Sequence, residues 1–281
     1  MLSPQPPIVA LVTGASSGIG EAAARRLAEE PGARLIIVAR RRERLEQLAA
    51  ELPAPTTFVA VDLTDPEAPG RVLEHVGETG GRLDLLVNNA GAAWRATFAE
   101  GGYANVRRTM DLNFDAVVRL TEALLPVLRS SAPSAVVNVA STAGRIARGG
   151  SGAYSASKFA LAGWSDALFA EERARGVHVG LVLPGFVATE GFPQRELVER
   201  RLTRWAVARP ESVAEAIVDA GLRGRAERYV PRPYALAGLV RLVAPGLVRR
   251  FLLGSGAAAL TTRTAGDAAD AEERPGEVYS A

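Results

Sequence analysis

The sequence has no cysteine, only two histidines and, among 33 basic residues, a single lysine. Without cysteine there can be no disulfide, no thiolate nucleophile and no cysteine zinc site. His75 and His178 lie far apart, each beside ordinary helix or strand residues, so structural roles are favoured for both. We therefore predict no bound metal and a chemistry that depends on other side chains.

We also expect that the first residues are not a secretory signal. The first residues, MLSPQPPIVALVTG, contain no basic segment and only a short apolar run before Thr13 and Gly14. A signal peptide needs both a basic start and a longer apolar core. We therefore predict a cytoplasmic protein.

The net charge of +2 is small but unevenly distributed. Residues 195 to 250 contain twelve arginines against six acidic residues, whereas residues 254 to 281 contain five acidic residues against two arginines. The basic stretch has no interleaved aromatic residues and no nucleic-acid-binding motif, so an ordinary solvated face is favoured. No nucleic-acid partner is predicted.

Short apolar segments rich in valine, isoleucine and leucine alternate with longer amphipathic segments. The apolar segments are residues 7–13, 34–39, 56–61, 83–87, 135–139, 177–183 and 228–231. Continuous apolar runs of this length are typical of strands buried on both faces, and their alternation with helices predicts a parallel sheet. We predict one α/β domain over residues 1–232, with a Rossmann-like, doubly wound parallel sheet of about seven strands.

The segment 233–253 is predicted to be an apolar and basic helical extension. Four residues interrupt the apolar run over 234–253 and disfavour a membrane span, namely Arg241, Pro245, Arg249 and Arg250. Packing on the body or on a partner is the favoured role, and peripheral contact with a membrane surface is the alternative. Residues 254–281 are small, polar and acidic, which predicts a mobile tail.

The first predicted strand leads into TGASSGIG, residues 13–20, and then directly into a helical segment. Glycines at 14, 18 and 20 allow a tight turn and a close approach of the backbone to a pyrophosphate, which the helix start would bind. The spacing differs from G-x-G-x-x-G, because three residues separate the first two glycines. The pattern predicts a dinucleotide site, with a glycine turn that serves packing only as the alternative.

The end of the second strand reads VARRRER, and this predicts the choice of cofactor. An acidic residue here would bind the ribose hydroxyl of NAD, whereas arginine accommodates the 2'-phosphate of NADP. Ala39 stands where the acid would be, and Arg40 and Arg41 follow. We predict a preference for NADP(H), with Arg40 as the main phosphate contact, and NAD(H) as the alternative.

Two more strand ends carry polar residues. Asp62 follows the third strand, where its carboxylate can accept a hydrogen bond from the adenine amino group, and the sequence NNAG, residues 88–91, follows the fourth. Ligands bind at the carboxyl ends of strands in open sheets, so both lie on the ligand side. Asparagine is also common in turns for structural reasons alone.

The one lysine lies in YSASK, one helical turn after Tyr154. A compact ammonium can lower the pKa of a nearby phenol, which a planar guanidinium does less well. In a chain that otherwise uses arginine, Lys158 is therefore predicted to be functional. The spacing of four residues puts both side chains on one helix face.

These motifs together resemble the short-chain dehydrogenase/reductase family, in its compact branch. The matching elements, in family order over residues 7 to about 190, are TGxxxGxG at Thr13–Gly20, NNAG at Asn88–Gly91, Asn113, Ser141, YxxxK at Tyr154–Lys158 and PGxxxT at Pro184–Thr189. The resemblance implies a catalytic set of Asn113, Ser141, Tyr154 and Lys158. In that set the tyrosine is the acid, the serine binds the substrate oxygen, and the asparagine helps to hold a water near the lysine.

The resemblance and the motifs also define the predicted cofactor-binding residues. They are Gly14, Ser16, Ser17, Gly18, Ile19, Gly20, Arg40, Arg41, Asp62, Leu63, Asn89, Ala90, Gly91, Tyr154, Lys158, Pro184, Gly185, Val187 and Thr189. Residues 190–209 stand where the family carries its substrate loop. The aromatic side chains predicted to line an apolar substrate pocket are Trp94, Phe186, Phe192 and Trp205.

The sequence thus predicts an NADP(H)-dependent oxidoreductase that interconverts a lipophilic ketone or aldehyde with its alcohol. The alternatives are an NAD-dependent alcohol dehydrogenase and a protein that binds NADP as a sensor or scaffold without turnover. By the same resemblance, a homodimer or homotetramer would assemble through helices at about 103–129 and 152–174.

Overall fold

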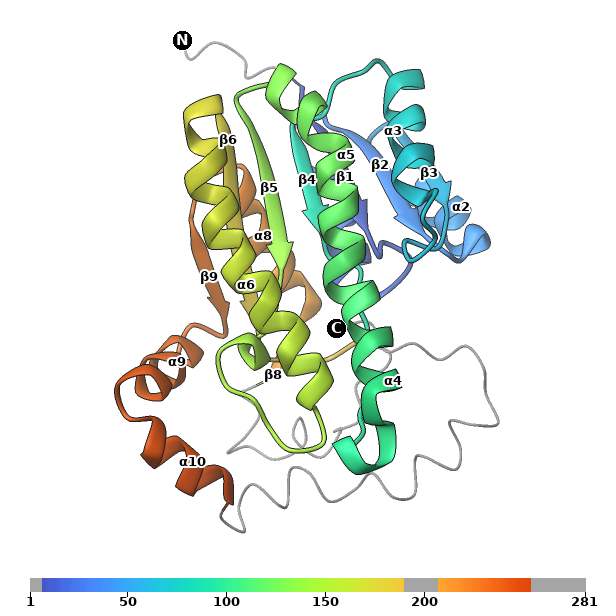
Figure 1. Cartoon of the computed structure of the whole chain (residues 1–281). Coiled ribbons are helices and arrows are strands. Elements are labelled where there is room, and N and C mark those ends of the chain that lie inside the picture. Colours follow the sequence, from blue (N-terminus) through green and yellow to red (C-terminus); the bar gives the residue numbers. More distant parts are fainter. Residues whose placement is uncertain (1–6, 190–206, 254–281) are drawn as a thin grey trace.

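The computed structural model describes residues 7–189 and 207–253 and contains a seven-stranded sheet in the order β3-β2-β1-β4-β5-β6-β9 (Figure 1). All six neighbouring pairs are parallel. The strands are β1 (Val9–Thr13), β2 (Arg34–Ala39), β3 (Thr56–Ala60), β4 (Leu85–Asn88), β5 (Ser134–Val139), β6 (Val177–Pro184) and β9 (Glu227–Val230). The predicted doubly wound sheet is confirmed, with each strand within two residues of its predicted segment.

Helices cover both faces of this sheet. They are α1 (Gly18–Leu27), α2 (Arg42–Glu51), α3 (Ala68–Glu78), α4 (Phe98–Met110), α5 (Ala116–Ser130), α6 (Gly152–Glu172) and α8 (Pro210–Gly221). One buried cluster joins α1, α2 and α8 to the sheet, and a second joins α3, α5 and α6 to the opposite face. Strands buried on both faces explain why the apolar runs are continuous rather than alternating.

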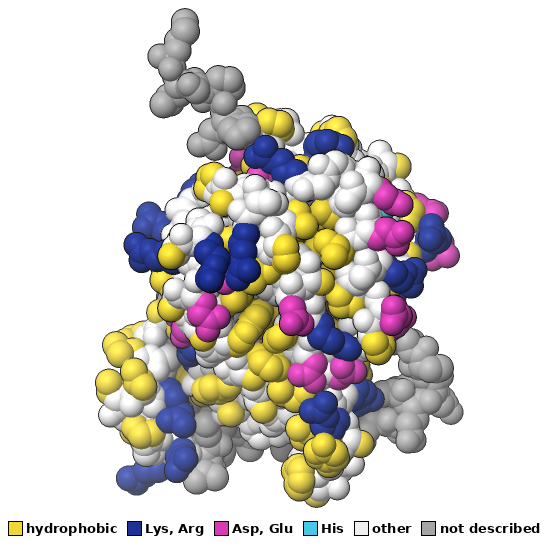
Figure 2. Space-filling model, turned by 45° about the horizontal axis from the view of Figure 1, so that its top comes forward, with side chains coloured by type: hydrophobic (Ala, Val, Ile, Leu, Met, Phe, Trp, Pro, Cys, Tyr) yellow, Lys and Arg dark blue, Asp and Glu magenta, His cyan; other side chains and the backbone are white. Residues whose placement is uncertain are grey.

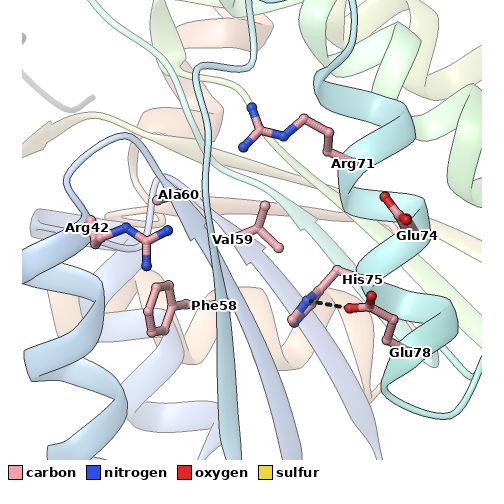
Figure 3. Close-up of a pocket in the computed structure, with 8 residues that line it drawn as sticks. All are labelled: Arg42, Phe58, Val59, Ala60, Arg71, Glu74, His75 and Glu78. Atoms are coloured by element: carbon pink, nitrogen blue, oxygen red, sulfur yellow. Dashed lines mark ion pairs between the residues drawn. The ribbon is translucent and has the colours of Figure 1, made fainter.

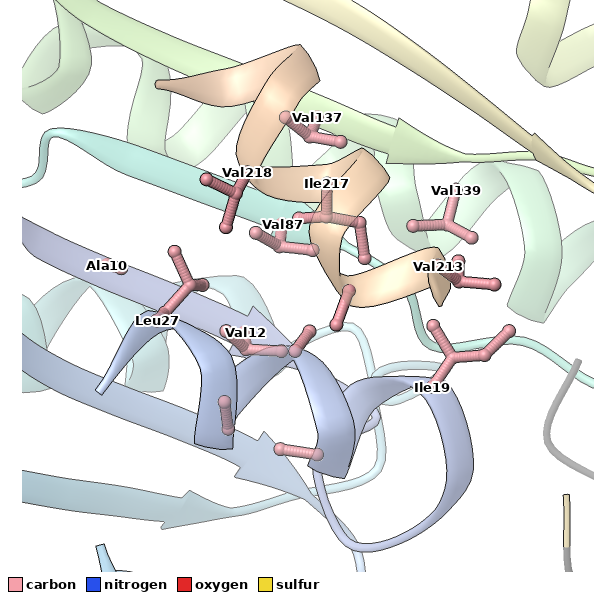
Figure 4. Packing of buried hydrophobic residues seen from close by; sticks show 14 of the residues in the cluster. Ala10, Val12, Ile19, Leu27, Val87, Val137, Val139, Val213, Ile217 and Val218 are labelled. Carbon is pink, nitrogen blue, oxygen red and sulfur yellow. The ribbon is translucent and has the colours of Figure 1, made fainter. Parts of the chain in front are cut away.

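The packing of α1 and α8 fixes the start of the chain on the sheet (Figure 4). Ile19 and Leu27 of α1 and Ile217 of α8 are fully buried against the strands. Burial of each such side chain contributes roughly 1.5–3 kcal/mol. Gly221 lies so close to the sheet that a Cβ there would come within 2.7 Å of the Leu85 side chain. The buried Ile19 anchors the first turn of α1 at the carboxyl end of β1.

The helix predicted over about 103–129 is not continuous. A π-helical turn, η1 (Asp111–Asp115), separates α4 from α5, and Asn113 lies at its centre. Single π-helical turns inside α-helices often occur at functional sites, because they redirect one side chain. The helix predicted over 152–174 agrees with α6 and the short helix η3 (Arg173–Arg175) that follows it.

The extension after β9 forms two helices, α9 (Tyr234–Val243) and α10 (Pro245–Leu253), and Pro245 lies at their break. Proline disfavours a helical conformation in the residue before it, which explains why one segment gives two helices. Leu242 is 78% exposed, and other leucines and valines of these helices are exposed as well. No helix among the described residues is long and apolar enough to span a membrane.

Candidate active site

The predicted site residues meet at the carboxyl edge of the sheet. The glycine-rich turn follows β1, NNAG extends from β4, Ser141 follows β5, and Pro184 ends β6 (Figure 1). Because neighbouring strands run in parallel, their carboxyl ends share one edge. The short strand β7 (Phe186–Val187) precedes the predicted substrate loop, 190–209, and pairs with β8 (Val207–Ala208) near the end of that loop, of which 190–206 fall outside the described residues.

The glycine-rich turn has the geometry that an anion-binding turn needs. Gly14 and Gly18 have φ angles of +67° and +57°, which other residues rarely adopt. A Cβ on Gly20 would collide with the backbone of Gly14 and the side chain of Asn89. Ser17, the N-cap residue of α1, makes no side-chain cap. The first amides of α1 are therefore available to bind phosphate.

Thr13 joins this turn to the NNAG segment. Its Oγ1 accepts hydrogen bonds from the amides of Asn89 at 2.9 Å and Ala90 at 3.0 Å and donates one to the carbonyl of Val87 at 3.2 Å. The Asn89 side chain donates in return to the Thr13 carbonyl at 3.0 Å. The backbone amide and the side-chain amide of Asn89 therefore both have structural roles, as expected for asparagine in such turns.

The two arginines after β2 lie in different places. Arg41 donates to Ser16 Oγ at 3.1 Å and to Ser17 Oγ at 2.8 Å, so its guanidinium lies across the glycine-rich turn. Arg40 pairs with Asp62 at 3.8 Å. Both arginines and Asp62 are exposed. The sequence singled out Arg40, whereas the structure brings Arg41 into contact with the turn.

Lys158 is buried at the centre of the site. It is 1% exposed, and its Nζ donates to the carbonyl of Val139 at 2.9 Å. Burial lowers the pKa of Lys158 from the ordinary 10.5 to about 8. A Cβ on Gly144 would lie 2.6 Å from the Lys158 carbonyl oxygen, and one on Gly91 would lie 3.4 Å from Nζ. Glycines therefore make room for both the helix and the ammonium.

Asn113 holds the chain around this lysine in place. Its Oδ1 accepts from the Ala92 amide at 2.8 Å, and its Nδ2 donates to the Ala92 carbonyl at 2.9 Å and to Ser157 Oγ at 3.1 Å. Ser157 Oγ in turn donates to the Tyr154 carbonyl at 2.8 Å. The π-helical turn thus connects the NNAG segment to the helix that carries Tyr154 and Lys158.

Tyr154 is half-buried in the first turn of α6, with its side chain hydrogen-bonded to Ser141. Burial raises the pKa of Tyr154, and the Ser141 hydrogen bond and the charges of Arg148 and Arg95 oppose this rise. The Lys158 ammonium lies 5.8 Å from the tyrosine ring centre. The expectation that Lys158 lowers the pKa of this phenol therefore differs from the structure, in which burial dominates and arginines supply the nearby charge.

Ser141 is buried, and two backbone groups fix its side chain. Its Oγ donates to the Pro184 carbonyl at 3.3 Å and accepts from the Ala143 amide at 3.1 Å, at the start of the short helix η2 (Thr142–Gly144). The Gly185 amide donates to Val230 at 2.8 Å, which fixes the PG segment against β9.

The remaining predicted cofactor residues lie around this edge. Val187 and Leu63 are buried, and the Thr189 amide donates to the Val187 carbonyl at 3.0 Å. The ring of Tyr234, from α9, lies directly over Gly185. The extension after residue 232 therefore contributes a side chain to the surroundings of the predicted nicotinamide position.

The predicted apolar pocket is less apolar than expected. The Arg108 guanidinium lies 4.5 Å from the centre of the Trp94 ring, and the Arg148 guanidinium lies 4.8 Å from that of Phe186. Phe192 and Trp205 fall outside the described residues. Sequence reasoning missed Arg95 and Arg148, because neither belongs to a motif in a chain so rich in arginine.

A separate hollow of about 190 Å³ lies at the far edge of the sheet, beside β3 (Figure 3). Its charged residues are partly paired, since His75 lies 3.6 Å from Glu78 and Arg42 covers the ring of Phe58 at 5.4 Å. None of the predicted site residues lines it. Across residues 7–189 and 207–253, no three potential ligands gather in a way that could hold a metal ion.

The residues at the carboxyl edge fit a nicotinamide dinucleotide. The positive φ angles of the turn, the space that a Cβ on Gly20 would fill and the uncapped start of α1 provide a pyrophosphate cradle. Arg41 lies across this turn, and Arg40 directly precedes Arg41 in the chain. These are features of this chain, independent of any relative.

Comparisons with known proteins agree with this geometry. A family model described as short chain dehydrogenase matches residues 8–198. The chain is 35% identical over 239 residues to the rhamnolipids biosynthesis 3-oxoacyl-(acyl-carrier-protein) reductase of Pseudomonas aeruginosa, covering 82% of this chain and 89% of the relative. It is 33% identical to the meso-2,3-butanediol dehydrogenase of Serratia marcescens over 212 residues, covering 73% and 84%. A solved short chain dehydrogenase/reductase family protein superposes with a TM-score of 0.71 at 30% identity, covering 79% of this chain and 94% of that one.

Proposed function

The chain belongs to the short-chain dehydrogenase/reductase family and is an oxidoreductase, and on that premise we propose that it uses NADP(H) to interconvert a ketone or aldehyde with its alcohol. The observation that carries the proposal is the grouping of Tyr154, Ser141 and Lys158 at the edge where the dinucleotide cradle lies. The relatives' names, a reductase of 3-oxoacyl groups and a dehydrogenase of a diol, support a carbonyl or alcohol substrate.

A nicotinamide bound at this edge would supply hydride to the carbonyl carbon or accept it from the alcohol carbon. Tyr154 gives its phenolic proton to the carbonyl oxygen during reduction and becomes a phenolate, which then regains a proton from solvent. Ser141 Oγ donates a hydrogen bond to the same oxygen and stabilises the charge that develops there. The charges of Arg148 and Arg95 favour the phenolate, and the Lys158 ammonium lies 5.8 Å from the centre of its ring.

Asn113 has a positioning role in this scheme. Through Ser157 it fixes the backbone of Tyr154, and through Ala92 it fixes the segment beside Lys158. A general acid must be placed within hydrogen-bond reach of the atom it protonates, and such placement contributes as much as its pKa.

The preference for NADP(H) over NAD(H) rests on Arg40 and Arg41. Arg40 forms an exposed ion pair with Asp62 at 3.8 Å, and Arg41 donates hydrogen bonds to the hydroxyl groups of Ser16 and Ser17. A 2'-phosphate at the end of β2 would accept hydrogen bonds from both guanidinium groups. Asp62 is left as the acceptor for the adenine amino group, although Thr64 already donates to its Oδ1 at 2.8 Å.

We also propose a homo-oligomer that assembles through α4, α5 and α6. These helices lie together on one face of the sheet, and Figure 2 shows hydrophobic side chains among the charged ones there. Phe98 and Tyr103 are 77% and 72% exposed, and Phe159 is exposed as well. Light scattering would reveal a dimer or tetramer, and a monomer at micromolar concentration would contradict the proposal. The cytoplasmic location and the division of the chain at residues 232 and 253 stay predictions.

The function is tested by following NADPH oxidation with a panel of ketones, aldehydes and quinones, and by comparing NADPH with NADH. The proposal predicts turnover with at least one carbonyl class and a lower KM for NADPH. A clear preference for NADH would leave the dehydrogenase role but remove the assignment of Arg40 and Arg41. NADPH binding without turnover of any carbonyl would favour a sensor or scaffold.

A further inference from the structure

Two loops beside Tyr154 are joined by backbone pairing. Ala96, in the loop after NNAG, forms a parallel bridge with Ser151, the residue just before α6. Arg95 directly precedes the first of these residues, and the Ser151 amide donates to the Arg148 carbonyl at 3.3 Å. The pairing therefore brings both arginines to the start of the helix whose first turn carries Tyr154.

Arg148 is held in a defined place. Its guanidinium lies 4.8 Å from the centre of the Phe186 ring. Phe186 follows Gly185 and Pro184, and the Pro184 carbonyl accepts the hydrogen bond from Ser141. The guanidinium thus rests on the same backbone segment that positions the proposed oxyanion contact, on the substrate side of the site.

No acidic side chain of the described residues, 7–189 and 207–253, forms an ion pair with Arg148 or Arg95. Burial and the like charge of Arg95 lower the pKa of Arg148. A partly buried guanidinium without a counter-charge is unfavourable, because it has lost water and gained no opposite charge. Two like charges held close together make the arrangement costlier still. Such an arrangement is typical of a site completed by an anion.

We propose that Arg95 and Arg148 bind an anionic group on the substrate, a carboxylate or a phosphate, so that the preferred substrate is an oxo acid or a phosphorylated carbonyl compound. This inference rests on the proposed carbonyl reduction. The planar guanidinium can donate two parallel hydrogen bonds to either group, whereas a neutral ketone cannot accept such a pair. The anion would also anchor the carbonyl beside Tyr154 and Ser141.

The test compares carbonyl compounds that differ in charge. The pairs are acetoacetate with ethyl acetoacetate, levulinate with methyl levulinate, and dihydroxyacetone phosphate with dihydroxyacetone. We expect kcat/KM to be at least about tenfold higher for the charged member of one pair, as a charge-assisted hydrogen bond would give. The first two pairs probe a carboxylate and the third probes a phosphate.

Variants then assign the preference to the arginines. Arg148→Gln should lower the charged-to-neutral ratio of kcat/KM by about tenfold or more, Arg95→Gln should lower it less because Arg95 is exposed, and Arg148→Lys should retain part of it. The matched control is Arg225→Gln, in the exposed loop that leads to the opposite end of β9. That substitution should leave the ratio unchanged.

Two outcomes separate this inference from the proposed function. If neutral carbonyls are reduced with the same kcat/KM as their charged partners, and Arg148→Gln does not alter the charged-to-neutral ratio, the proposed anion site is wrong and the proposed reductase activity is unaffected. If no carbonyl is reduced, the anion site is tested by thermal unfolding with hexanoate and hexanamide. A Tm rise with hexanoate alone, lost in Arg148→Gln, supports the site, and equal behaviour of the two compounds overturns it.

Discussion

The two halves of the site hold their arginines in opposite ways. On the cofactor half, Arg40 and Arg41 are exposed and rest on nearby polar groups, Asp62 and the serines of the glycine-rich turn. On the catalytic half, Arg148 is partly buried, lies on an aromatic ring and has a second arginine rather than an acid as its charged neighbour among the described residues. Both arginines of the first pair are exposed and screened by water, whereas in the second pair Arg148 is partly buried and less screened.

The rest of each half follows the same division. The cofactor half is built from backbone amides and glycines, while the catalytic half is built from buried side chains that are hydrogen-bonded to each other and to backbone. The comparison teaches that changes in the cofactor half should mainly alter affinity for the dinucleotide. Changes in the catalytic half should alter turnover and stability together, because those groups are buried.

The largest effect is expected when lysine and arginine are interchanged in each half of the site. Lys158→Arg keeps the charge but places a broad fork in a space sized for an ammonium. We expect kcat to fall by about 10²–10⁴-fold, the range typical of disrupted acid–base catalysis. The matched exchange on the other half, Arg41→Lys, should raise KM for NADPH and leave kcat within about threefold of the wild-type value. The reason is that Arg41 would bind the cofactor equally in the ground state and in the transition state. Near-normal turnover of Lys158→Arg would contradict the catalytic assignment.

A second test uses pH to measure the burial of Lys158. The folded pKa of about 8 lies below the ordinary 10.5, so the folded state binds fewer protons than the unfolded state between these values. The free energy of unfolding should therefore rise by about 3 kcal/mol between pH 8 and 10.5. The same contribution is lost again as the pH falls from 10.5 to 8.

The variant Lys158→Met lacks this titration and serves as the reference. Relative to it, the wild-type protein should gain free energy of unfolding between pH 8 and 10.5, as measured by urea unfolding. A constant difference between the two proteins over that range would show that the lysine is solvated.

Asn113→Ala tests the hydrogen-bonded character of the catalytic half. It removes partners from the amide and carbonyl of Ala92, both of which are then left buried. We expect a loss of about 2 kcal/mol in the free energy of unfolding, together with a lower kcat. Asp115→Ala, in the same π-helical turn, removes only an exposed ion pair with Arg107 and should cost less than about 1 kcal/mol. Equal losses would contradict a specific role for Asn113.

The smallest expected effect lies in the cofactor half. Arg41→Ala and Arg40→Ala should each raise KM for NADPH by about tenfold and leave KM for NADH nearly unchanged, since each removes a charged contact to phosphate. Arg44→Ala, an exposed residue of α2, is the control and should alter neither constant. A parallel rise in KM for both cofactors would show that these arginines support the fold of the turn instead.

The sheet could be predicted from the sequence because parallel strands buried on both faces leave continuous apolar runs. The motifs also predicted residues that the structure brings together at the carboxyl edge of the sheet, since glycine at positive φ and the Tyr154 and Lys158 spacing are local signals. The break of the helix at Asn113 was less accessible, because a π-helical turn depends on the tertiary bonds of that side chain to Ala92 and Ser157.

The charge environment of Tyr154 could not be predicted. It depends on the Ala96–Ser151 bridge, which brings together loops more than 50 residues apart. Neither Arg95 nor Arg148 differs in local sequence from the many other arginines. The same holds for Tyr234, whose position over Gly185 depends on where α9 packs.

The central claim is that Tyr154 is the proton donor of an NADPH-dependent carbonyl reductase. The most direct measurement is NADPH oxidation with the best carbonyl substrate, made side by side for the wild-type protein and Tyr154→Phe, with NADPH affinity determined by fluorescence titration. We predict that the variant binds NADPH normally and loses at least about 10²-fold in kcat. A variant that reduces the carbonyl at the wild-type rate would contradict the claim.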